Sequence, residues 1–334
     1  MEAVMKISKN DLCVFVATYN RPDLVLVQLK SLLAQTVRPD SITMLDNGGL
    51  PETKVALEPL ASLGVRLVDT SALGRLGNLK MAQKLAEGRY VAVFHDDDAV
   101  ECHYFETILA VLNSGMHDDI RLVLANSRHQ KIGEFLYPSA LAHACGWVLD
   151  VPQMADYLLA MPAGYFPFAF YSIEAFKAFD IDRIWGLYEK WCDIPMLLEA
   201  IDGGNAIVLQ YPFGVYGRHP NQDSGDRQNL PDVRAWANLE AVYVNALGED
   251  LHTATGWTNV IWNRRRLSTG YKRRGKKTIG WKEYLQYAAD IGAVNAHPLL
   301  SWLLSRRVIQ KAYSKIRRSH YMGSVKELGG CHAK

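Results

Sequence analysis

The sequence predicts an α/β fold in which a mostly parallel sheet carries helices on both faces. Through the first 125 residues, short apolar runs alternate with segments of helical periodicity. Alternation of strands with helices of about ten residues is typical of parallel sheets. The runs are apolar at almost every position, as expected of strands buried on both faces. Polar clusters follow several of these runs, and the carboxyl ends of parallel strands are where such sheets bind ligands.

The elements of this first region follow one another closely. Leu12–Ala17 is the first expected strand, and apolar residues at helical spacing predict a helix over 23–35. The turn-forming residues 46–49 end a second expected strand, Ser41–Leu45. The elements expected next are helix 52–63, strand 65–68, helix 76–86, strand 90–94, helix 103–112 and strand 120–125.

The second half of the chain is less regular. A polar segment rich in Gly, Pro and Asn predicts a loop over 211–230. The other elements expected here are helix 193–200, strand 206–210 and helices 233–247, 281–291 and 299–318.

Composition and charge divide the chain in two. Its 334 residues are 49% apolar and 22% charged, which excludes a disordered or fibrous protein. The net charge is only +2, yet residues 226–334 hold 19 basic and 8 acidic residues, whereas residues 1–225 hold 18 and 27. We therefore expect a catalytic domain over 1–225 and a basic, mainly helical C-terminal extension over 226–334. The extension would face an anionic partner or the acidic first half.

Sequence features favour a cytoplasmic location. No apolar run approaches the roughly 20 residues of a membrane-spanning helix, and the N-terminus lacks the apolar core of a signal peptide. Five scattered cysteines without metal-ligand spacing are typical of free thiols in a reducing compartment.

Basic residues concentrate in two segments, with eight in 264–277 and six in 306–318. We expect them to bind an anionic membrane surface, peripherally on the inner face of the membrane. The alternative is a packing helix with a solvated basic face. No nucleic-acid recognition motif accompanies them, so no nucleic-acid partner is expected.

Three consecutive aspartates, Asp96, Asp97 and Asp98, follow a buried strand and are the strongest functional signal. Neighbouring carboxylates repel one another unless a cation relieves them. In extended backbone Asp96 and Asp98 point to one side and Asp97 to the other. Two carboxylates on one side suit Mg²⁺ or Mn²⁺. We prefer this metal site to the alternative of a solvated acidic turn.

Other polar residues each allow a functional and a structural interpretation. Asp46 could accept hydrogen bonds from a base or ribose, or only form a turn. Arg75 lies between glycines before a helix and could meet a phosphate. Asp193 could be a general base or a helix N-cap, and His219 a metal or phosphate ligand or a loop residue. Residues 18–21 lack glycine, which argues against the dinucleotide-binding turn of nicotinamide and flavin enzymes.

Taken together, these segments resemble the family 2 glycosyltransferases of the GT-A fold. The resemblance covers about residues 11–222 and rests on the order and spacing of several short motifs. These motifs are VATYNRPD (16–23), LKSL (29–32), AQT (34–36), PD (39–40), LDN (45–47), GRLGN (74–78), AEGRY (86–90) and the D-x-D of 96–98.

The resemblance implies a site for a nucleotide-diphospho-sugar donor. It places Asp46 near the base, Asn78 near the ribose and phosphates, and Asp96 against the ribose or the metal. The implied donor-binding residues are Thr18, Tyr19, Arg21, Asp46, Arg75, Asn78, Asp96 and Asp97. Asp98, with Asp96 and His219, would hold Mn²⁺ or Mg²⁺.

The resemblance also implies a catalytic base. Cys192-Asp193 and the later pair Gly203-Gly204 match the acidic pair and glycine of the family, which favours Asp193. The first acid of the pair is Cys192 here, so Glu189 stays a rival base, and Ala99 stands where an acid often follows D-x-D.

The reaction implied is inverting, metal-dependent transfer of a sugar to a hydroxyl acceptor, glycan or lipid-linked, in cell-surface polysaccharide or glycolipid assembly. One alternative is a sugar-nucleotide pyrophosphorylase. Such an enzyme would carry a glycine-rich loop after the first strand, and residues 18–22 contain no glycine. The other alternative is a non-catalytic nucleotide- or glycan-binding module.

Overall fold

The computed structural model describes residues 6–115, 119–131, 145–160, 164–219, 233–247 and 326–327. The basic segments 264–277 and 306–318 lie outside these ranges, as do the helices expected at 281–291 and 299–318. The helix expected at 233–247 is present with those bounds.

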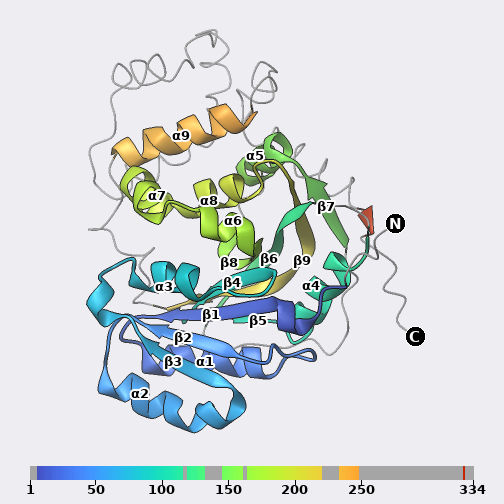
Figure 1. Cartoon of the computed structure of the whole chain (residues 1–334). Helices are drawn as coiled ribbons and strands as arrows, with labels where there is room; N and C mark the ends of the chain where they lie inside the picture. The colour runs from blue at the N-terminus through green and yellow to red at the C-terminus, as the bar shows by residue number, and fades with distance from the viewer. Residues whose placement is uncertain are drawn as a thin grey trace.

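Strands and helices alternate along the first part of the chain, as the sequence predicted (Figure 1). The strands are β1 (Leu12–Thr18), β2 (Ile42–Asp46), β3 (Val65–Asp69), β4 (Tyr90–His95), β5 (Ala99–Val100), β6 (Ile120–Lys131), β7 (Cys145–Leu149), β8 (Gly164–Ser172), β9 (Asn205–Arg218) and β10 (Lys326–Glu327). The α-helices are α1 (Pro22–Leu33), α2 (Pro51–Leu57), α3 (Gly77–Leu85), α4 (Tyr104–Leu112), α5 (Val151–Ala160), α6 (Ile173–Ala178), α7 (Ile181–Tyr188), α8 (Asp193–Ala200) and α9 (Val233–Leu247).

The strands form one mixed sheet in the order β10-β7-β9-β6-β8-β4-β1-β2-β3, with β5 paired to β9. Its first half is parallel, because β1 pairs in parallel with both β2 and β4, and β2 with β3. In its second half β8 runs antiparallel to β4 and β6, and β7 antiparallel to β9. The expectation of a mostly parallel sheet therefore holds for β1–β4, while the later strands, some of them not expected, make the sheet mixed.

Helices cover both faces of the sheet, and strand alternation divides the core between them. Phe15 of β1 and Val93 of β4 join the buried cluster beneath α3 and α5–α9. Val16 of β1 and Phe94 of β4 join the opposite cluster, which contains residues of α1 and α4. Successive side chains of a strand point to opposite faces, so each central strand is apolar at nearly every position.

The polar loop expected at 211–230 is wrong in its first part, because β9 continues to Arg218. Phe213 and Val215 are buried, and β9 pairs along this stretch with both β5 and β6. Residues 213–215 are all buried, and the glycines and proline of this segment obscured the strand in the sequence.

Local signals explain where the helices near the site begin. Pro22 and Pro51 occupy the first turns of α1 and α2, where a missing N–H costs nothing. Among the described residues, every helix is too short or too polar to cross a lipid bilayer.

Candidate active site

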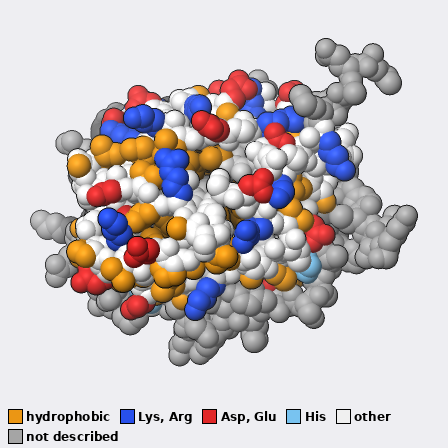
Figure 2. Space-filling view, turned by 60° about the horizontal axis from the view of Figure 1, so that its bottom comes forward, with side chains coloured by type: hydrophobic (Ala, Val, Ile, Leu, Met, Phe, Trp, Pro, Cys, Tyr) orange, Lys and Arg blue, Asp and Glu red, His pale blue; other side chains and the backbone are white. Residues whose placement is uncertain are grey.

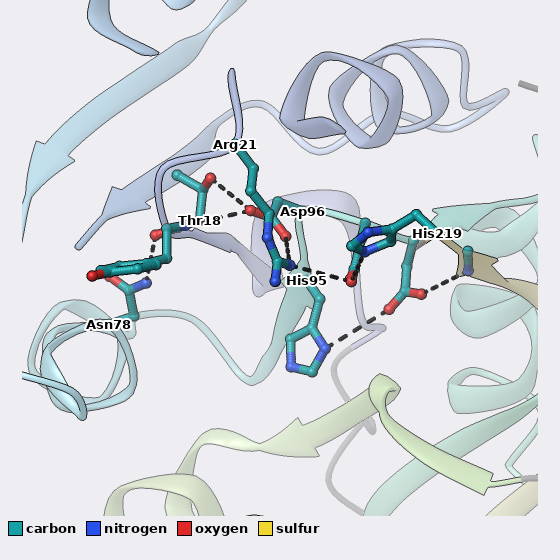
Figure 3. Close-up of polar contacts among 10 residues, drawn as sticks. Thr18, Arg21, Asn78, His95, Asp96 and His219 are labelled. Carbon is teal, nitrogen blue, oxygen red and sulfur yellow. Dashed lines mark hydrogen bonds and ion pairs between the residues drawn. The ribbon is translucent and has the colours of Figure 1, made fainter. Parts of the chain in front are cut away.

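The polar residues predicted to act together converge at the carboxyl ends of β1 and β4 (Figure 3). Thr18 ends β1, and the three aspartates occupy the connection from β4 to β5. Residues 96 and 97 form a turn rather than extended backbone. The expectation that Asp96 and Asp98 share one side assumed extended backbone, and the turn removes that assumption.

Asp96 binds the loop that follows β1. Its Oδ2 accepts hydrogen bonds from Thr18 Oγ1 at 2.7 Å and from the N–H of Tyr19 at 3.4 Å. Its Oδ1 accepts one from Arg21 Nη1 at 3.2 Å. The carboxylate is buried, so these bonds satisfy charge that water does not reach. Asp96 therefore fixes the loop of residues 18–21 against the aspartate turn.

Asp97 contacts two cationic or polar side chains. Its Oδ2 lies 3.3 Å from Arg21 Nη1 and 3.0 Å from His219 Nε2. His219 directly follows β9, so the long strand delivers it to the turn. The sequence thus predicted His219 near the aspartates, and the structure places it on Asp97.

Asp98 has one oxygen satisfied and one without a hydrogen bond. Its Oδ1 accepts from the backbone N–H of Gly217 at 3.1 Å. Its Oδ2 is buried and has no hydrogen-bond partner in the described part of the chain. His95 Nδ1 lies 3.9 Å from this Oδ2. Ligand atoms of His95, Asp97 and Asp98 all lie within 4.8 Å of one another.

Burial raises the pKa values of Asp96, Asp98 and Asp193, and like charge adds to the shift at the first two. Burial raises the pKa of Asp98 well above its usual value, and the charges of Asp97, Asp96 and Asp193 add to the shift. Burial, followed by the charge of Asp97, raises the pKa of Asp96. Burial also raises the pKa of Asp193, and the interaction with His95 lowers it in part. Asp193 and the aspartate turn therefore share one electrostatic environment.

This donor set fits a divalent cation. An unpartnered carboxylate oxygen in a buried position is costly, and a bound cation would supply its missing partner. Two carboxylates and one imidazole are ligand types that divalent metals accept.

Asp193 is the first residue of α8, as expected, and is half-buried. Its Oδ1 accepts a hydrogen bond from Cys192 Sγ at 3.7 Å. The predicted cap bond is absent, because no side chain caps this helix start. The rival Glu189 follows α7 with a left-handed φ of 47° and is half-buried. Asp193, rather than Glu189, is the carboxylate whose charge acts on Asp98.

Asp46 and Asn78 make hydrogen bonds that organise the strand ends. Asp46 Oδ1 accepts from the N–H groups of Gly48 and Gly49, at 2.9 and 3.2 Å, as the turn interpretation expected. Asn78 Oδ1 accepts from Thr70 Oγ1, and its Nδ2 donates to the carbonyl of Thr18 at 3.2 Å. Asn78 thereby links α3 to the end of β1 and to the residue that follows β3.

The remaining predicted donor residues are exposed. Tyr19 is 62% exposed. The guanidinium of Arg75 lies 4.6 Å from the ring centre of Trp185 in α7. Arg75 also acts electrostatically on Cys192, which places it on the Asp193 side of the site.

Sequence reasoning missed His95. Its signal was available, since a histidine directly before three aspartates at a strand end adds a metal-ligand type to the cluster. The turn at residues 96 and 97, which brings His95 beside Asp98, could not be predicted from the alternation of strand residues.

Known proteins show similarity to this chain at two levels. Residues 13–177 match the family model described as Glycosyl transferase family 2. The structure of S. aureus TarS 1-349 in complex with UDP-GlcNAc is similar with a TM-score of 0.58 and 16% identity, over 93% of this chain and 92% of that one. The structure of S. aureus TarS has a TM-score of 0.57 and 14% identity, and 53% of its chain is covered, against 93% of this one.

No curated protein sequence matches the chain. The structural matches show the fold, which is that of the GT-A glycosyltransferases, and the family model covers the segment that carries the loop after β1 and the aspartate turn. The chain is therefore a glycosyltransferase whose residues 13–177 form a domain of glycosyl transferase family 2.

Proposed function

We propose that the protein transfers a sugar from a nucleotide-diphosphate donor to a hydroxyl acceptor, with inversion at the anomeric carbon and with the help of Mn²⁺ or Mg²⁺. The observation that carries the proposal is the buried, unpartnered Oδ2 of Asp98 beside Asp97, within the electrostatic reach of Asp193. The UDP-GlcNAc bound to the TarS structure supports a nucleotide-sugar donor.

The donor would lie across the loop of residues 18–21 and the aspartate turn. Asp96 holds that loop through Thr18 and Arg21, so the donor would meet a preorganised surface. Asp46, Arg75 and Asn78 would border it, as the resemblance implies. The hydrogen bonds of Asp46 and Asn78 favour a positioning role, in which they fix the backbone that the nucleotide contacts.

Asp98 would hold the cation. Asp96 binds Arg21, and His219 binds Asp97, so these two residues would position the neighbours of the ion rather than coordinate it. When bound, the ion supplies stabilisation of the negative charge that grows on the departing diphosphate.

Asp193 would act on the acceptor. Its carboxylate takes the hydroxyl proton while the acceptor oxygen forms a bond to the anomeric carbon, and the bond from that carbon to the diphosphate oxygen breaks. A single displacement of this kind inverts the anomeric configuration. The raised pKa of Asp193 suits the task, because a base is most effective when its pKa approaches the working pH.

The proposal extends to the domain division and the acceptor. Residues 1–225 would carry both substrates, and the basic residues of 226–334 would bring the enzyme to an anionic membrane surface. The acceptor would then be a glycan or lipid-linked hydroxyl of cell-surface polysaccharide or glycolipid assembly.

The test begins with a thermal-shift screen of nucleotide-sugars with and without Mn²⁺, which identifies the donor because a ligand raises the melting temperature by mass action. Transfer is then measured for Asp193→Asn and for the rival Glu189→Gln. We expect Asp193→Asn to lose about 100-fold or more of the transfer rate, and Glu189→Gln to stay within about threefold. Full activity in Asp193→Asn would remove that residue from the mechanism.

A further inference from the structure

His95 was not among the residues predicted to bind a metal. It ends β4, and its side chain is 45% exposed, with Nδ1 directed toward Oδ2 of Asp98 at 3.9 Å (Figure 3). With Asp97 it completes the group of ligand atoms that lie within 4.8 Å of one another. Six-coordinate cations place neighbouring ligands closer than this, so a small inward movement would bring the three atoms around one ion.

The oxygens of the three aspartates differ in what they already bind. Asp97 contacts Arg21 and His219 through Oδ2. Both oxygens of Asp96 accept hydrogen bonds, from Thr18, Tyr19 and Arg21. Asp98 accepts one bond at Oδ1, but its Oδ2 has no hydrogen-bond partner among the described residues, and the residue is 0% exposed. That orphaned oxygen is the independent sign of a missing ligand, and it faces His95 rather than Asp96.

We propose that His95 is a metal ligand together with Asp97 and Asp98, and that its imidazole makes the site select Mn²⁺ over Mg²⁺. Mg²⁺ prefers oxygen ligands and gives up its water reluctantly. Imidazole nitrogen favours first-row transition ions, whose affinity for such a site exceeds that of Mg²⁺. The inference rests on the proposed function for the presence of a cation, and it assigns the ligand set and the kind of ion.

The test uses Mn²⁺ alone with the full chain, and pulsed electron paramagnetic resonance to detect ¹⁴N coupled to the bound ion. The variants are His95→Gln, His219→Gln for the predicted rival ligand, and His103→Gln as a matched control. His103 is half-buried and bonds Glu106 at 3.0 Å, outside the cluster. Titrations give Kd for Mn²⁺ and Mg²⁺ in each protein.

We expect ¹⁴N coupling in the wild type that disappears in His95→Gln and persists in His219→Gln and His103→Gln. Replacing a residue that only orients a metal ligand costs about 10- to 100-fold in metal affinity. Replacing a ligand itself should cost no less, so His95→Gln should weaken Mn²⁺ binding by at least about tenfold. Binding of Mg²⁺ should change by less than about threefold.

A wild-type spectrum without ¹⁴N coupling, or coupling that persists in His95→Gln, overturns the inference. The wild-type spectrum decides even where a variant fails to fold. A parallel transfer assay separates the two proposals. Active transfer without ¹⁴N coupling contradicts only the ligand set, and ¹⁴N coupling without transfer from any donor contradicts only the proposed function.

Discussion

Asp98 is a residue in which the requirements of folding and of function conflict. The side chain is buried, one oxygen lacks a hydrogen bond, and three other carboxylates act on it. The bond to Gly217 occupies Oδ1 alone, and a bound cation would offset the cost of Oδ2. A carboxyl whose pKa is raised in the folded state contributes stability below its unfolded pKa, and that contribution is lost as the pH rises through the folded pKa.

Asp98→Asn should therefore stabilise the metal-free protein at neutral pH. Removing the charge relieves an unsatisfied buried group, an effect of about 1–3 kcal/mol that corresponds to roughly 2–4 °C in Tm for each kcal/mol. The gain should shrink as the pH falls from 8 toward the ordinary value of 3.8, because the wild-type carboxyl then becomes neutral. Thermal melts in EDTA across this range measure it.

Asp69→Asn is the control, because Ser71 lowers the pKa of this exposed carboxyl and the sign is opposite. It should give no gain at pH 8. Adding Mn²⁺ should stabilise the wild type and not Asp98→Asn. A lower Tm for Asp98→Asn at pH 8 in EDTA would contradict the account.

The pKa of Asp193 predicts the acid limb of the transfer reaction. The base must be ionised, and burial raises its pKa, so kcat/KM should fall as the pH drops through a value above that of an ordinary aspartate. The thiol of Cys192 opposes the shift by its hydrogen bond. Cys192→Ala should therefore move the limb to still higher pH. The check is a pH–rate profile of both proteins; identical limbs would exclude Asp193 as the titrating base.

At the scale of elements, the sequence predicted most of the helices and strands in the first 112 residues. The expected helices and strands through Leu112 lie within a few residues of their bounds, because buried strands and amphipathic helices have different periods. The exception is the helix expected over 52–63, where α2 ends at Leu57 and Glu58–Leu63 forms a 3-10 helix. The prediction did not assign β7, α5, β8, α6 and α7. The chain is uncharged over 157–173, and Tyr157, Leu158 and residues 168–171 are buried, so periodicity could not distinguish strand from helix.

The candidate site was predictable to the same degree. The strand ends gave Thr18, Asp46 and the aspartates, since parallel strands align their carboxyl ends. Contacts across distant segments were not predictable from pattern. Asp97 meets His219 because β9 runs beside β6 and continues to Arg218, into the segment expected to be a loop.

Asn78 provides a test at this scale, because it joins α3 to Thr18 and Thr70. Asn78→Ala removes both bonds. The Thr18 carbonyl keeps the N–H of Asn47, but the buried Thr70 hydroxyl loses its acceptor, so the free energy of unfolding should fall by about 1–3 kcal/mol. It should also weaken donor binding by displacing the loop after β1. Lys80 lies on α3 as well, and Lys80→Ala removes its exposed ion pair with Asp182 of α7, so it should cost about 1 kcal/mol or less. Urea denaturation measures both, and equal effects would argue against the bracing role.

For the whole molecule, charge is unevenly divided along the sequence. On the face shown in Figure 2, basic and acidic side chains are interspersed, with no region of one sign. The excess of basic residues belongs to 226–334, most of which lies outside the described residues. Membrane attachment therefore stays a prediction from composition.

Co-sedimentation with vesicles tests this prediction. We expect the full chain to bind vesicles containing anionic lipid at low salt, to release at high salt, and to ignore neutral vesicles, because the attraction is electrostatic. Replacing the five basic residues of 272–277 with Gln should weaken binding by several kcal/mol, at about 1 kcal/mol for each charge. No binding to anionic vesicles at low salt would leave the basic region with a packing role.

The chain from Asp193 to His219 has one further consequence. It begins with the proposed base, passes through α8 and β9, and ends at the histidine on Asp97, with Gly217 on Asp98 two residues earlier. Because side chains of a strand alternate, inserting or deleting a single residue within β9 would reverse which of them face the aspartates. Natural relatives and engineered variants should therefore vary in length before Asp193 or after His219, and keep the spacing between them constant.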